Sequence, residues 1–257
     1  MTEQQPPKVA LVVGGSRGTG RTIALRLARD GIRTLVLGRD RARLDELAAT
    51  AKADGHEIIG VEADLTDRAA CLSALDAAAA KHGAPYILVH CAAAHYQHQR
   101  LHFVELDEMD RLLRTDLESA IYITSWALKD MFASRGGRIV YLGSLAGTQG
   151  HPGATLYATA KAGLEGLCRG VAVDYGGRGV TANTLSLGMI ETERLAERTR
   201  NVPEVRDKLL KLTTTGQFIK QEDIAELVCF LCGPFGGQIT GSVIQMTGGT
   251  HLRTIPG

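Results

Sequence analysis

An alternation of short apolar segments with longer segments of helical period constrains the fold of this chain most strongly. The apolar segments are rich in Val, Ile and Leu and fall at 9–13, 34–37, 58–61, 86–90, 138–142, 181–185 and 243–246. Helical spacing of apolar residues occurs between them, near 19–30, 41–54, 67–82, 107–134, 155–176 and 222–232. This alternation is typical of βαβ units on a parallel sheet. It predicts an α/β fold with seven parallel strands.

The same pattern runs along the chain without a linker. In 257 residues, of which 44% are hydrophobic, we find no low-complexity stretch and no internal repeat. A chain of this length and composition can bury a full core of its own. We therefore expect a single domain over residues 1–257, in which a polar, helix-prone insertion at 189–215 acts as a lid over the substrate.

Charge and cysteine content argue against several classes of partner. The formal net charge is +1 and like charges do not cluster, so the chain lacks the basic stripe that nucleic acid or an anionic membrane requires. The first residues do not resemble a signal peptide, and no apolar stretch reaches the roughly 18 residues of a membrane span. Five irregularly spaced cysteines are typical of reduced thiols. We expect a cytoplasmic protein that acts on a small molecule.

A glycine-rich turn follows the first predicted strand. Gly14, Gly18 and Gly20 have the spacing GxxxGxG and precede a helical segment. Glycines let the chain turn sharply and bring backbone N–H groups against a phosphate, toward which the positive end of the helix also points. A plain tight turn is the simpler interpretation, but the position between strand and helix favours a dinucleotide pyrophosphate. A Walker-type loop is excluded because no Gly-Lys-Ser/Thr closes the turn.

The end of the second predicted strand indicates which dinucleotide binds. An Asp or Glu there would bind the ribose 2′-hydroxyl of NADH and repel the 2′-phosphate of NADPH. This chain has Gly38 followed by Arg39, and Arg17 lies in the glycine turn. Because planar guanidinium groups suit a phosphate, the pattern favours NADPH/NADP over NAD. The alternatives are that both arginines are merely solvated, or that Asp40 pairs with Arg39.

Three side chains around the fifth predicted strand form a candidate catalytic set. Ser144 follows that strand, and Tyr157 and Lys161 have the spacing YxxxK, which places them on one face of a helix. A lysine cation beside a phenol stabilises the phenolate, which suits the phenol to proton transfer. The YxxxK pattern alone is weak, because most such pairs are ordinary surface residues.

Taken together, these motifs resemble the short-chain dehydrogenase/reductase family. The resemblance rests on the glycine turn, on Ser144, Tyr157 and Lys161, and on "ADLTD" at 63–67, "LSLGMIETE" at 185–193 and "ITGSVIQMTGG" at 239–249, which occur in the family's order across nearly the whole chain. It implies a single Rossmann-like, doubly wound domain with seven parallel strands. It also implies a homotetramer or homodimer that associates through the two long helices flanking the catalytic residues.

The resemblance also implies roles for individual positions. Tyr157 would protonate the substrate oxygen as hydride arrives from the nicotinamide, and Ser144 would bind the substrate carbonyl. Lys161, next to Tyr157, would bind the nicotinamide ribose. The other implied cofactor contacts are Gly14, Ser16, Arg17, Gly18 and Thr19 for the phosphates, Asp64 and Leu65 for the adenine, and Gly188, Ile190 and Thr192 for the carboxamide.

Three single positions depart from the family's pattern. Asp116 stands where the family usually has an Asn that holds a water linked to Lys161. A carboxylate could hold that water as a catalytic residue, favouring the charged lysine and opposing a phenolate on Tyr157, or it could hydrogen-bond only locally. Val13 and Leu187 replace a Thr and a Pro that are common in the family, and neither change removes a reacting group.

The end of the fourth predicted strand is a further departure. The family usually has Asn-Asn-Ala-Gly there, whereas this chain has "HCAA" at 90–93, which places His90 and Ala92 near the cofactor. Histidines at 95, 98 and 102 follow and could in principle collect a metal on a helix. Since the family's chemistry needs no metal and no acidic residue is interleaved, we expect none. We predict instead that His95 and His98 border the substrate cleft.

The sequence leaves three possible functions open. The leading prediction is an NADPH-dependent oxidoreductase that transfers hydride between the nicotinamide and a ketone or secondary alcohol, with Tyr157 as general acid/base. An enoyl-thioester reductase of the same family is an alternative, although the short YxxxK spacing favours carbonyl chemistry. A nucleotide-binding protein with altered catalysis is the other alternative. His151 and Met189 are expected to join the substrate contacts.

Overall fold

The strands form one parallel sheet in a computed structural model that describes residues 8–200 and 202–252. The strands are β1 (Val9–Val13), β2 (Arg33–Gly38), β3 (Ile58–Glu62), β4 (Ile87–His90), β5 (Gly137–Leu142), β6 (Val180–Leu187) and β7 (Val243–Met246). Their order across the sheet is β3-β2-β1-β4-β5-β6-β7. The chain thus winds outward from β1 to β3 and returns to the other side of β1 with β4, so the predicted doubly wound α/β fold is confirmed.

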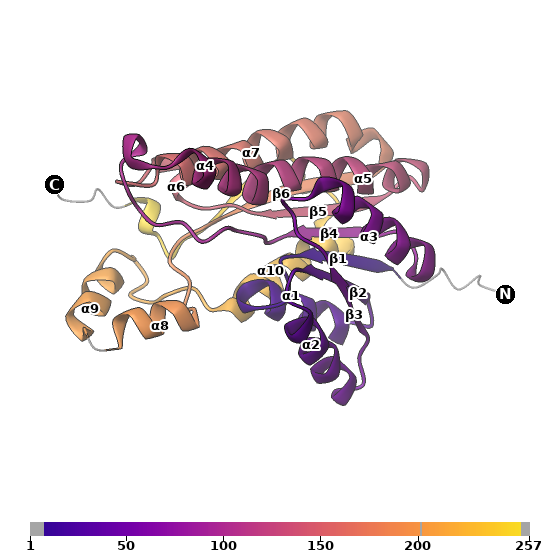
Figure 1. Ribbon diagram of the computed structural model, residues 1–257, viewed down its shortest axis with the longest axis horizontal. Helices are drawn as coiled ribbons and strands as arrows, with labels where there is room; N and C mark the ends of the chain where they lie inside the picture. The colour runs from indigo at the N-terminus through magenta and orange to yellow at the C-terminus, as the bar shows by residue number, and fades with distance from the viewer. Residues whose placement is uncertain (1–7, 201, 253–257) are drawn as a thin grey trace.

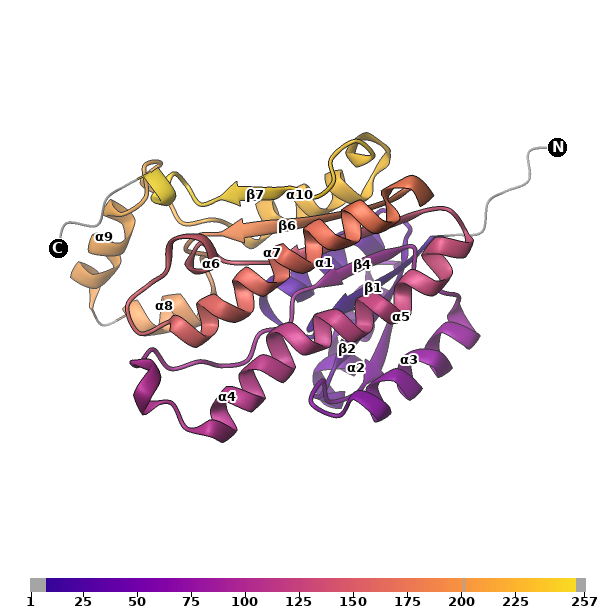
Figure 2. The same ribbon diagram turned by 90° about the horizontal axis from the view of Figure 1, so that it is seen from above.

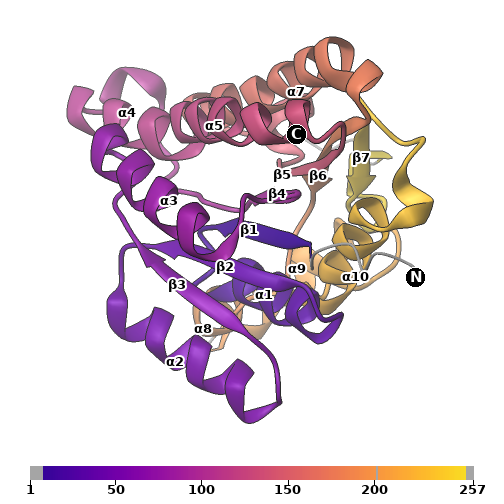
Figure 3. The same ribbon diagram turned by 90° about the vertical axis from the view of Figure 1, so that its right-hand side faces the viewer.

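Helices cover both faces of this sheet (Figure 1). One face carries α3 (Arg68–His82), α5 (Ser119–Ala133) and α7 (Thr155–Tyr175), and the other carries α1 (Gly18–Arg29), α2 (Arg41–Ala53) and α10 (Gln221–Cys232). Figure 3 shows the resulting three layers, with the sheet between the two sets of helices. Among the described residues, no helix is long and apolar enough to cross a bilayer.

The two main cores lie on opposite faces of the central strands. Leu11 of β1 packs toward α3, α5 and α7, whereas its neighbour Val12 packs toward α1, α2 and α10. Both side chains are fully buried, and burial of a side chain of this size stabilises the fold by roughly 1.5–3 kcal/mol. Because each face of β1 is covered, its sequence is a continuous apolar run and does not alternate with polar residues.

Short helices gather at the carboxyl ends of the strands. They are α4 (Leu106–Leu113), α6 (Ala146–Gln149), α8 (Glu193–Thr199) and α9 (Pro203–Lys211). Figure 2 shows α8 and α9 extending beyond the ends of β6 and β7. The base of this insertion is fixed by a parallel bridge between Ile190 and Ile219. The insertion therefore lies at the end of the sheet where ligands bind in doubly wound folds.

The helix predicted over 107–134 is interrupted in the structure. A π-helical turn, η2 (Arg114–Glu118), separates α4 from α5, and the backbone N–H of Ser119 donates to the carbonyl of Arg114. Such a turn adds one residue to a helix and is frequent at functional sites. Asp116 lies within it and is fully buried. The sequence pattern did not reveal the turn, because apolar residues continue at helical spacing on both sides of it.

Candidate active site

The glycine turn packs against the end of β4. Gly14 has a φ of +75°, and its N–H donates to the carbonyl of Leu37 at 2.8 Å. A Cβ on Gly14 would lie 2.7 Å from the Cα of Ala92, and one on Gly20 would lie 2.5 Å from the carbonyl oxygen of Gly14. Glycine is therefore required at both positions, and the predicted Ala92 lies directly against the turn.

The first turn of α1 is open to an anion. Arg17 is extended at its N-cap position, and among the described residues none caps this helix through a side chain; its first turn also lacks an acidic residue. The N-terminal N–H groups and the helix dipole favour negative charge at such an end. The half-buried Ser16 and Thr19 lie in the same segment. The residues present thus fit the pyrophosphate of a dinucleotide.

Arg39 is exposed at the end of β2, and Asp40 does not pair with it. The Oδ2 atom of Asp40 lies 3.1 Å from Nε of Arg43, and Oδ1 of Asp40 accepts a hydrogen bond from the backbone N–H of Arg43 at 3.1 Å. Asp40 therefore serves as the N-cap of α2. The alternative in which Asp40 neutralises Arg39 is wrong.

Asp64 and Leu65 follow β3, next to the second strand. The Oδ1 atom of Asp64 accepts hydrogen bonds from the N–H of Thr66 at 2.8 Å and from its hydroxyl at 2.7 Å. These bonds, together with the weaker field of Arg39, lower the pKa of Asp64 although partial burial opposes the shift. The carbonyl of Leu65 accepts a hydrogen bond from the hydroxyl of Tyr122 at 3.0 Å. Asp64 is thus a charged acceptor at neutral pH.

Lys161 and Asp116 form a buried ion pair. The Nζ atom of Lys161 lies 3.3 Å from Oδ2 of Asp116 and donates to the carbonyl of Leu142 at 3.3 Å. Burial alone would lower the pKa of Lys161, but Asp116 and then Tyr157 outweigh it, and the pKa is raised. Lys161 is therefore a cation, and its Nζ lies 5.5 Å from the centre of the Tyr157 ring.

Asp116 also holds the loop that follows β4. Its Oδ1 atom accepts a hydrogen bond from the N–H of Ala94 at 2.6 Å, while Oδ2 faces Lys161. One carboxylate thus joins the π-helical turn, the loop after β4 and α7. The interpretation in which Asp116 bonds only within its own helix is wrong, because both contacts are to distant segments.

Ser144 and Tyr157 lie on adjoining elements. The Oγ atom of Ser144 accepts a hydrogen bond from the N–H of Ala146 at 3.2 Å, which leaves the hydroxyl proton available for another acceptor. Tyr157 is half-buried in the first turn of α7. The segment after Ser144 is pressed against α7, since a Cβ on Gly147 would lie 3.0 Å from the backbone nitrogen of Ala162.

The predicted contacts of the nicotinamide carboxamide follow β6. A Cβ on Gly188 would lie 2.9 Å from the Cα of Thr247, so the two segments approach closely. Ile190 forms the bridge at the base of the insertion. The hydroxyl oxygen of Thr192 accepts a hydrogen bond from the N–H of Leu195 at 3.2 Å and caps α8.

The histidines of the fourth strand and its loop have different surroundings. His90 is fully buried and its Nε2 lies 2.8 Å from Oγ of Ser119. His95 and His98 are exposed, and the His98 ring lies edge-on to that of His151 with 5.0 Å between centroids. The backbone carbonyl of Met189 accepts a hydrogen bond from the N–H of Ile219 at 2.9 Å. In the described part of the chain, no three histidine, cysteine or acidic side chains are grouped to hold a metal.

Comparison with known proteins settles the family. A family model described as enoyl-(acyl carrier protein) reductase matches residues 13–251. The 3-oxoacyl-[acyl-carrier-protein] reductase of Pseudomonas aeruginosa is 34% identical, and the match covers 95% of this chain and 98% of that protein. The solved short-chain dehydrogenase/reductase of Serratia marcescens is 33% identical, with a TM-score of 0.87 and coverage of 95% of this chain and 98% of that one. The chain belongs to the short-chain dehydrogenase/reductase family.

A further solved relative is an actinorhodin polyketide ketoreductase with NADPH. It is 25% identical to this chain, with a TM-score of 0.89, and the match covers 95% of this chain and 97% of that one. The resemblance inferred from the motifs is thus confirmed, and this short-chain dehydrogenase/reductase is an oxidoreductase.

Sequence reasoning assigned no role of their own to two residues that this member of the family places in the site. Ser119 bonds to His90, and Tyr96 stacks on Tyr157 with ring centroids 6.3 Å apart and an angle of 12° between ring planes. Tyr96 lies in a mostly polar loop, so only the contrast between its aromatic ring and its neighbours could have suggested that it is buried. Ser119 lies within a helical pattern and gives no comparable signal.

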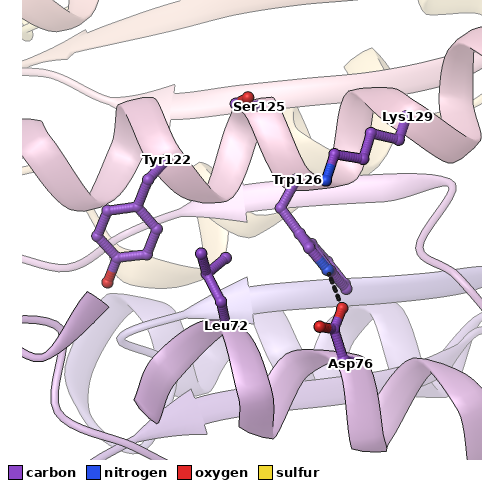
Figure 4. Close-up of a pocket in the computed structure, with 6 residues that line it drawn as sticks. All are labelled: Leu72, Asp76, Tyr122, Ser125, Trp126 and Lys129. Carbon is purple, nitrogen blue, oxygen red and sulfur yellow. Dashed lines mark hydrogen bonds between the residues drawn. The ribbon is translucent and has the colours of Figure 1, made fainter. Parts of the chain in front are cut away.

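A pocket of about 200 Å³ between α3 and α5 lies outside this site (Figure 4). It is lined by Leu72, Asp76, Tyr122, Ser125, Trp126 and Lys129. The indole Nε1 of Trp126 donates to Oδ1 of Asp76 at 2.7 Å across it. No predicted catalytic or cofactor residue lines this pocket.

Proposed function

We propose that this protein reduces the ketone of a 3-oxoacyl thioester to a secondary alcohol, with NADPH as the hydride source. The coarser activity, NADPH-dependent interconversion of a ketone and a secondary alcohol, is the one predicted from the sequence, and the relatives confirm it. They do not favour the enoyl-thioester alternative. The 3-oxoacyl substrate class is suggested by the relatives that act on acyl-carrier-protein thioesters.

The observation that carries the residue roles is the position of the Lys161 cation. It is held between a buried carboxylate at 3.3 Å and the ring of Tyr157 at 5.5 Å. A positive charge beside a phenol stabilises the phenolate that remains after proton transfer. Ser144 retains a hydroxyl proton that is not used by its own hydrogen bond to Ala146. These features support Tyr157 as general acid and Ser144 as the group that binds the carbonyl.

Each group then has a defined part in the reduction. When bound, NADPH supplies the hydride that forms the new C–H bond at the carbonyl carbon. The Ser144 hydroxyl donates a hydrogen bond to the carbonyl oxygen, and the Tyr157 hydroxyl transfers its proton to that oxygen as negative charge develops there. Lys161 stabilises the tyrosinate until it is reprotonated. The products are a secondary alcohol and the oxidised cofactor.

Cofactor binding is assigned to the edge of the sheet between β1 and β4. The glycine turn and the open end of α1 hold the pyrophosphate, and Arg17 and Arg39 hold the 2′-phosphate. The pairing of Asp40 with Arg43 supports this assignment, because it leaves the Arg39 guanidinium available to a phosphate. Asp64 accepts a hydrogen bond from the adenine amino group.

We also propose that the protein is a cytoplasmic homo-oligomer that associates through α5 and α7. Large apolar side chains on these two helices face solvent: Ile121 and Phe132 on α5, and Val173 on α7. Val173 is 82% exposed, and a second copy of the chain packed on this surface would bury it. The Phe132 and Tyr175 rings meet edge-on, with centroids 6.2 Å apart, and join the two helices into one surface.

The test is NADPH oxidation, followed by absorbance, with a 3-oxoacyl thioester, a simple ketone and an enoyl thioester. We expect turnover of the 3-oxoacyl thioester and none of the enoyl thioester. Tyr157→Phe should retain NADPH binding and lose about 10²-fold or more in kcat. A wild-type protein that binds NADPH but turns over no carbonyl compound would support the non-catalytic alternative and contradict the proposal.

A further inference from the structure

Tyr96 is a buried aromatic residue in the loop that leaves β4. Its side chain is only 7% exposed, whereas His95, Gln97 and His98 around it are exposed. The ring lies nearly parallel to that of Tyr157, with 6.3 Å between centroids, a separation at which offset aromatic rings attract each other. The loop therefore turns one side chain inward, directly against the proposed general acid.

A separate hydrophobic cluster surrounds the Tyr96 ring. This satellite core consists of Tyr96, Val104, Leu112, Ala154, Leu156 and Ala160, and Tyr157 packs at its edge. It joins the loop after β4, the helix α4 and the start of α7, and it is distinct from the two main cores on the sheet. The position of Tyr96 is thus fixed by packing from several elements.

The hydroxyl of Tyr96 ties the same loop to the turn before α7. It donates to the carbonyl of Gly153 at 2.8 Å, and the N–H of Gln99 donates to that carbonyl at 2.9 Å. Gly153 has a φ of +73°, and a Cβ there would lie 3.0 Å from the nitrogen of Gln99. On the other side of Tyr96, the N–H of Ala94 is bonded to Asp116. The loop is therefore held at both ends.

The surroundings of Tyr96 and Tyr157 determine which of the two tyrosines can act as the general acid. Burial raises the pKa of Tyr96, so its hydroxyl stays protonated, and that proton is committed to the carbonyl of Gly153. Tyr157 lies beside the cation of Lys161 and is half-buried in the first turn of its helix. The end of a helix is the part most prone to fraying, so the phenol of Tyr157 needs support from outside α7.

We propose that Tyr96 is a positioning residue for Tyr157, because its ring fixes the plane of the catalytic phenol. This inference rests on the proposed role of Tyr157 as general acid. The stacked ring restricts Tyr157 to the orientation in which its hydroxyl meets the substrate oxygen. Because a misplacement of about 1 Å can cost about 10²-fold in rate, this restriction acts on kcat and not on cofactor binding.

The experiment compares two variants of Tyr96 with a matched control in the full-length protein. Tyr96→Met fills the satellite core with an unbranched apolar side chain of similar reach but removes the flat ring. Tyr96→Phe keeps the ring and removes only the hydroxyl. Phe103→Leu removes an aromatic ring from the same segment at an exposed position and is the control. For each, kcat, KM, the pH–rate profile, the Kd of NADPH and the thermal midpoint are measured.

The proposal expects a loss that is concentrated in kcat. Tyr96→Met should lower kcat by about tenfold or more with KM and the Kd of NADPH within about twofold, since near-attack geometry alone is affected. Tyr96→Phe should restore kcat to within about threefold of wild type, because stacking is retained. The Phe103→Leu control should match wild type.

Other outcomes overturn the proposal. A folded Tyr96→Met protein with wild-type kcat, or with a loss confined to KM, shows that Tyr96 does not position the acid. If Tyr96→Met does not fold, Tyr96→Phe decides: a tenfold fall in its kcat would contradict the role of the ring. An active Tyr157→Phe enzyme would instead refute the proposed function itself, so the two failures are distinguishable.

Discussion

The Nε2 atom of His90 lies 2.8 Å from Oγ of Ser119, and this contact determines the state of the histidine. The Ser119 hydroxyl donates to the carbonyl of Thr115 at 2.6 Å, so its proton is not available for the imidazole. His90 must therefore carry its own proton on Nε2. Its Nδ1 is buried without a partner among the described residues. The hydrogen bonds that link His90 to Ser119 and Ser119 to Thr115 stabilise the π-helical turn that contains Asp116.

A neutral, buried His90 makes stability depend on pH. Burial, and next the cation of Lys161, lowers the pKa of His90 from 6.5 to about 3. Between these values the unfolded chain binds a proton that the native state does not, so stability falls as the pH falls, by about 1.4 kcal/mol per unit. Urea unfolding at pH values from 7 to 4 gives the free energy of unfolding at each pH. Its slope against pH should be smaller in His90→Asn than in wild type. The exposed variant His102→Asn is the control, and parallel curves for wild type and His90→Asn would contradict the expectation.

Asp116→Asn should move the pH–rate profile while folding and NADPH binding are retained. The carboxylate raises the pKa of Lys161 against the effect of burial, so its removal lowers that pKa. Lys161 then loses its proton at lower pH, and the alkaline limb of the kcat profile should shift to lower pH. Asp107→Asn, at an exposed position on α4, is the matched control. An unchanged profile would place the carboxylate outside proton transfer.

Arg39→Ala should weaken the preference for NADPH. A hydrogen bond between charged partners contributes about 1.5–3 kcal/mol, which corresponds to a fall of roughly tenfold or more in kcat/KM for NADPH. The kcat/KM for NADH should hardly change, since NADH lacks the 2′-phosphate. Steady-state kinetics with both cofactors measure this. Arg29→Ala removes an exposed arginine at the other end of α1 for comparison, and an equal loss with both cofactors would argue against a phosphate contact.

Val173→Asp should dissociate the proposed oligomer without unfolding the chain. The side chain is 82% exposed in the isolated chain, so the charge costs little there but opposes burial against a second copy. Light scattering after size-exclusion chromatography gives the molar mass, and circular dichroism checks the fold. Lys52→Asp, on the opposite face of the sheet, should leave the mass unchanged. A wild-type protein that is already monomeric would refute association through this surface.

The strands and the main helices could be predicted because their local patterns and their tertiary surroundings agree. The central strand β1 is apolar throughout, and it is buried on both faces. The glycine turn was recognisable since Gly14 and Gly20 leave no room for a Cβ. The YxxxK spacing likewise placed Tyr157 and Lys161 on one helix, where the structure brings the lysine cation to the phenol ring.

The remaining features depend on contacts between distant segments. No local pattern shows that Asp116 meets Lys161, because the contact requires a π-helical turn within an otherwise regular helix. Tyr96 is buried because α4, the turn at Gly153 and the start of α7 pack against its loop. The partner of His90 is Ser119, 29 residues away in the sequence, so the sequence suggested a cofactor contact for His90 and not its bond to the helix.

The π-helical turn η2 also sets the rotational phase between the two halves of the long helix. Successive residues of an α-helix advance by about 100°, so one extra residue in the turn rotates everything after it relative to everything before it. Leu112, before the turn, packs into the satellite core, whereas Ile123, after it, packs into the main core on the sheet. Deleting one residue from η2 would restore a continuous α-helix and turn one of these faces toward solvent. The extra residue thus lets one helix serve two cores that lie at different angles.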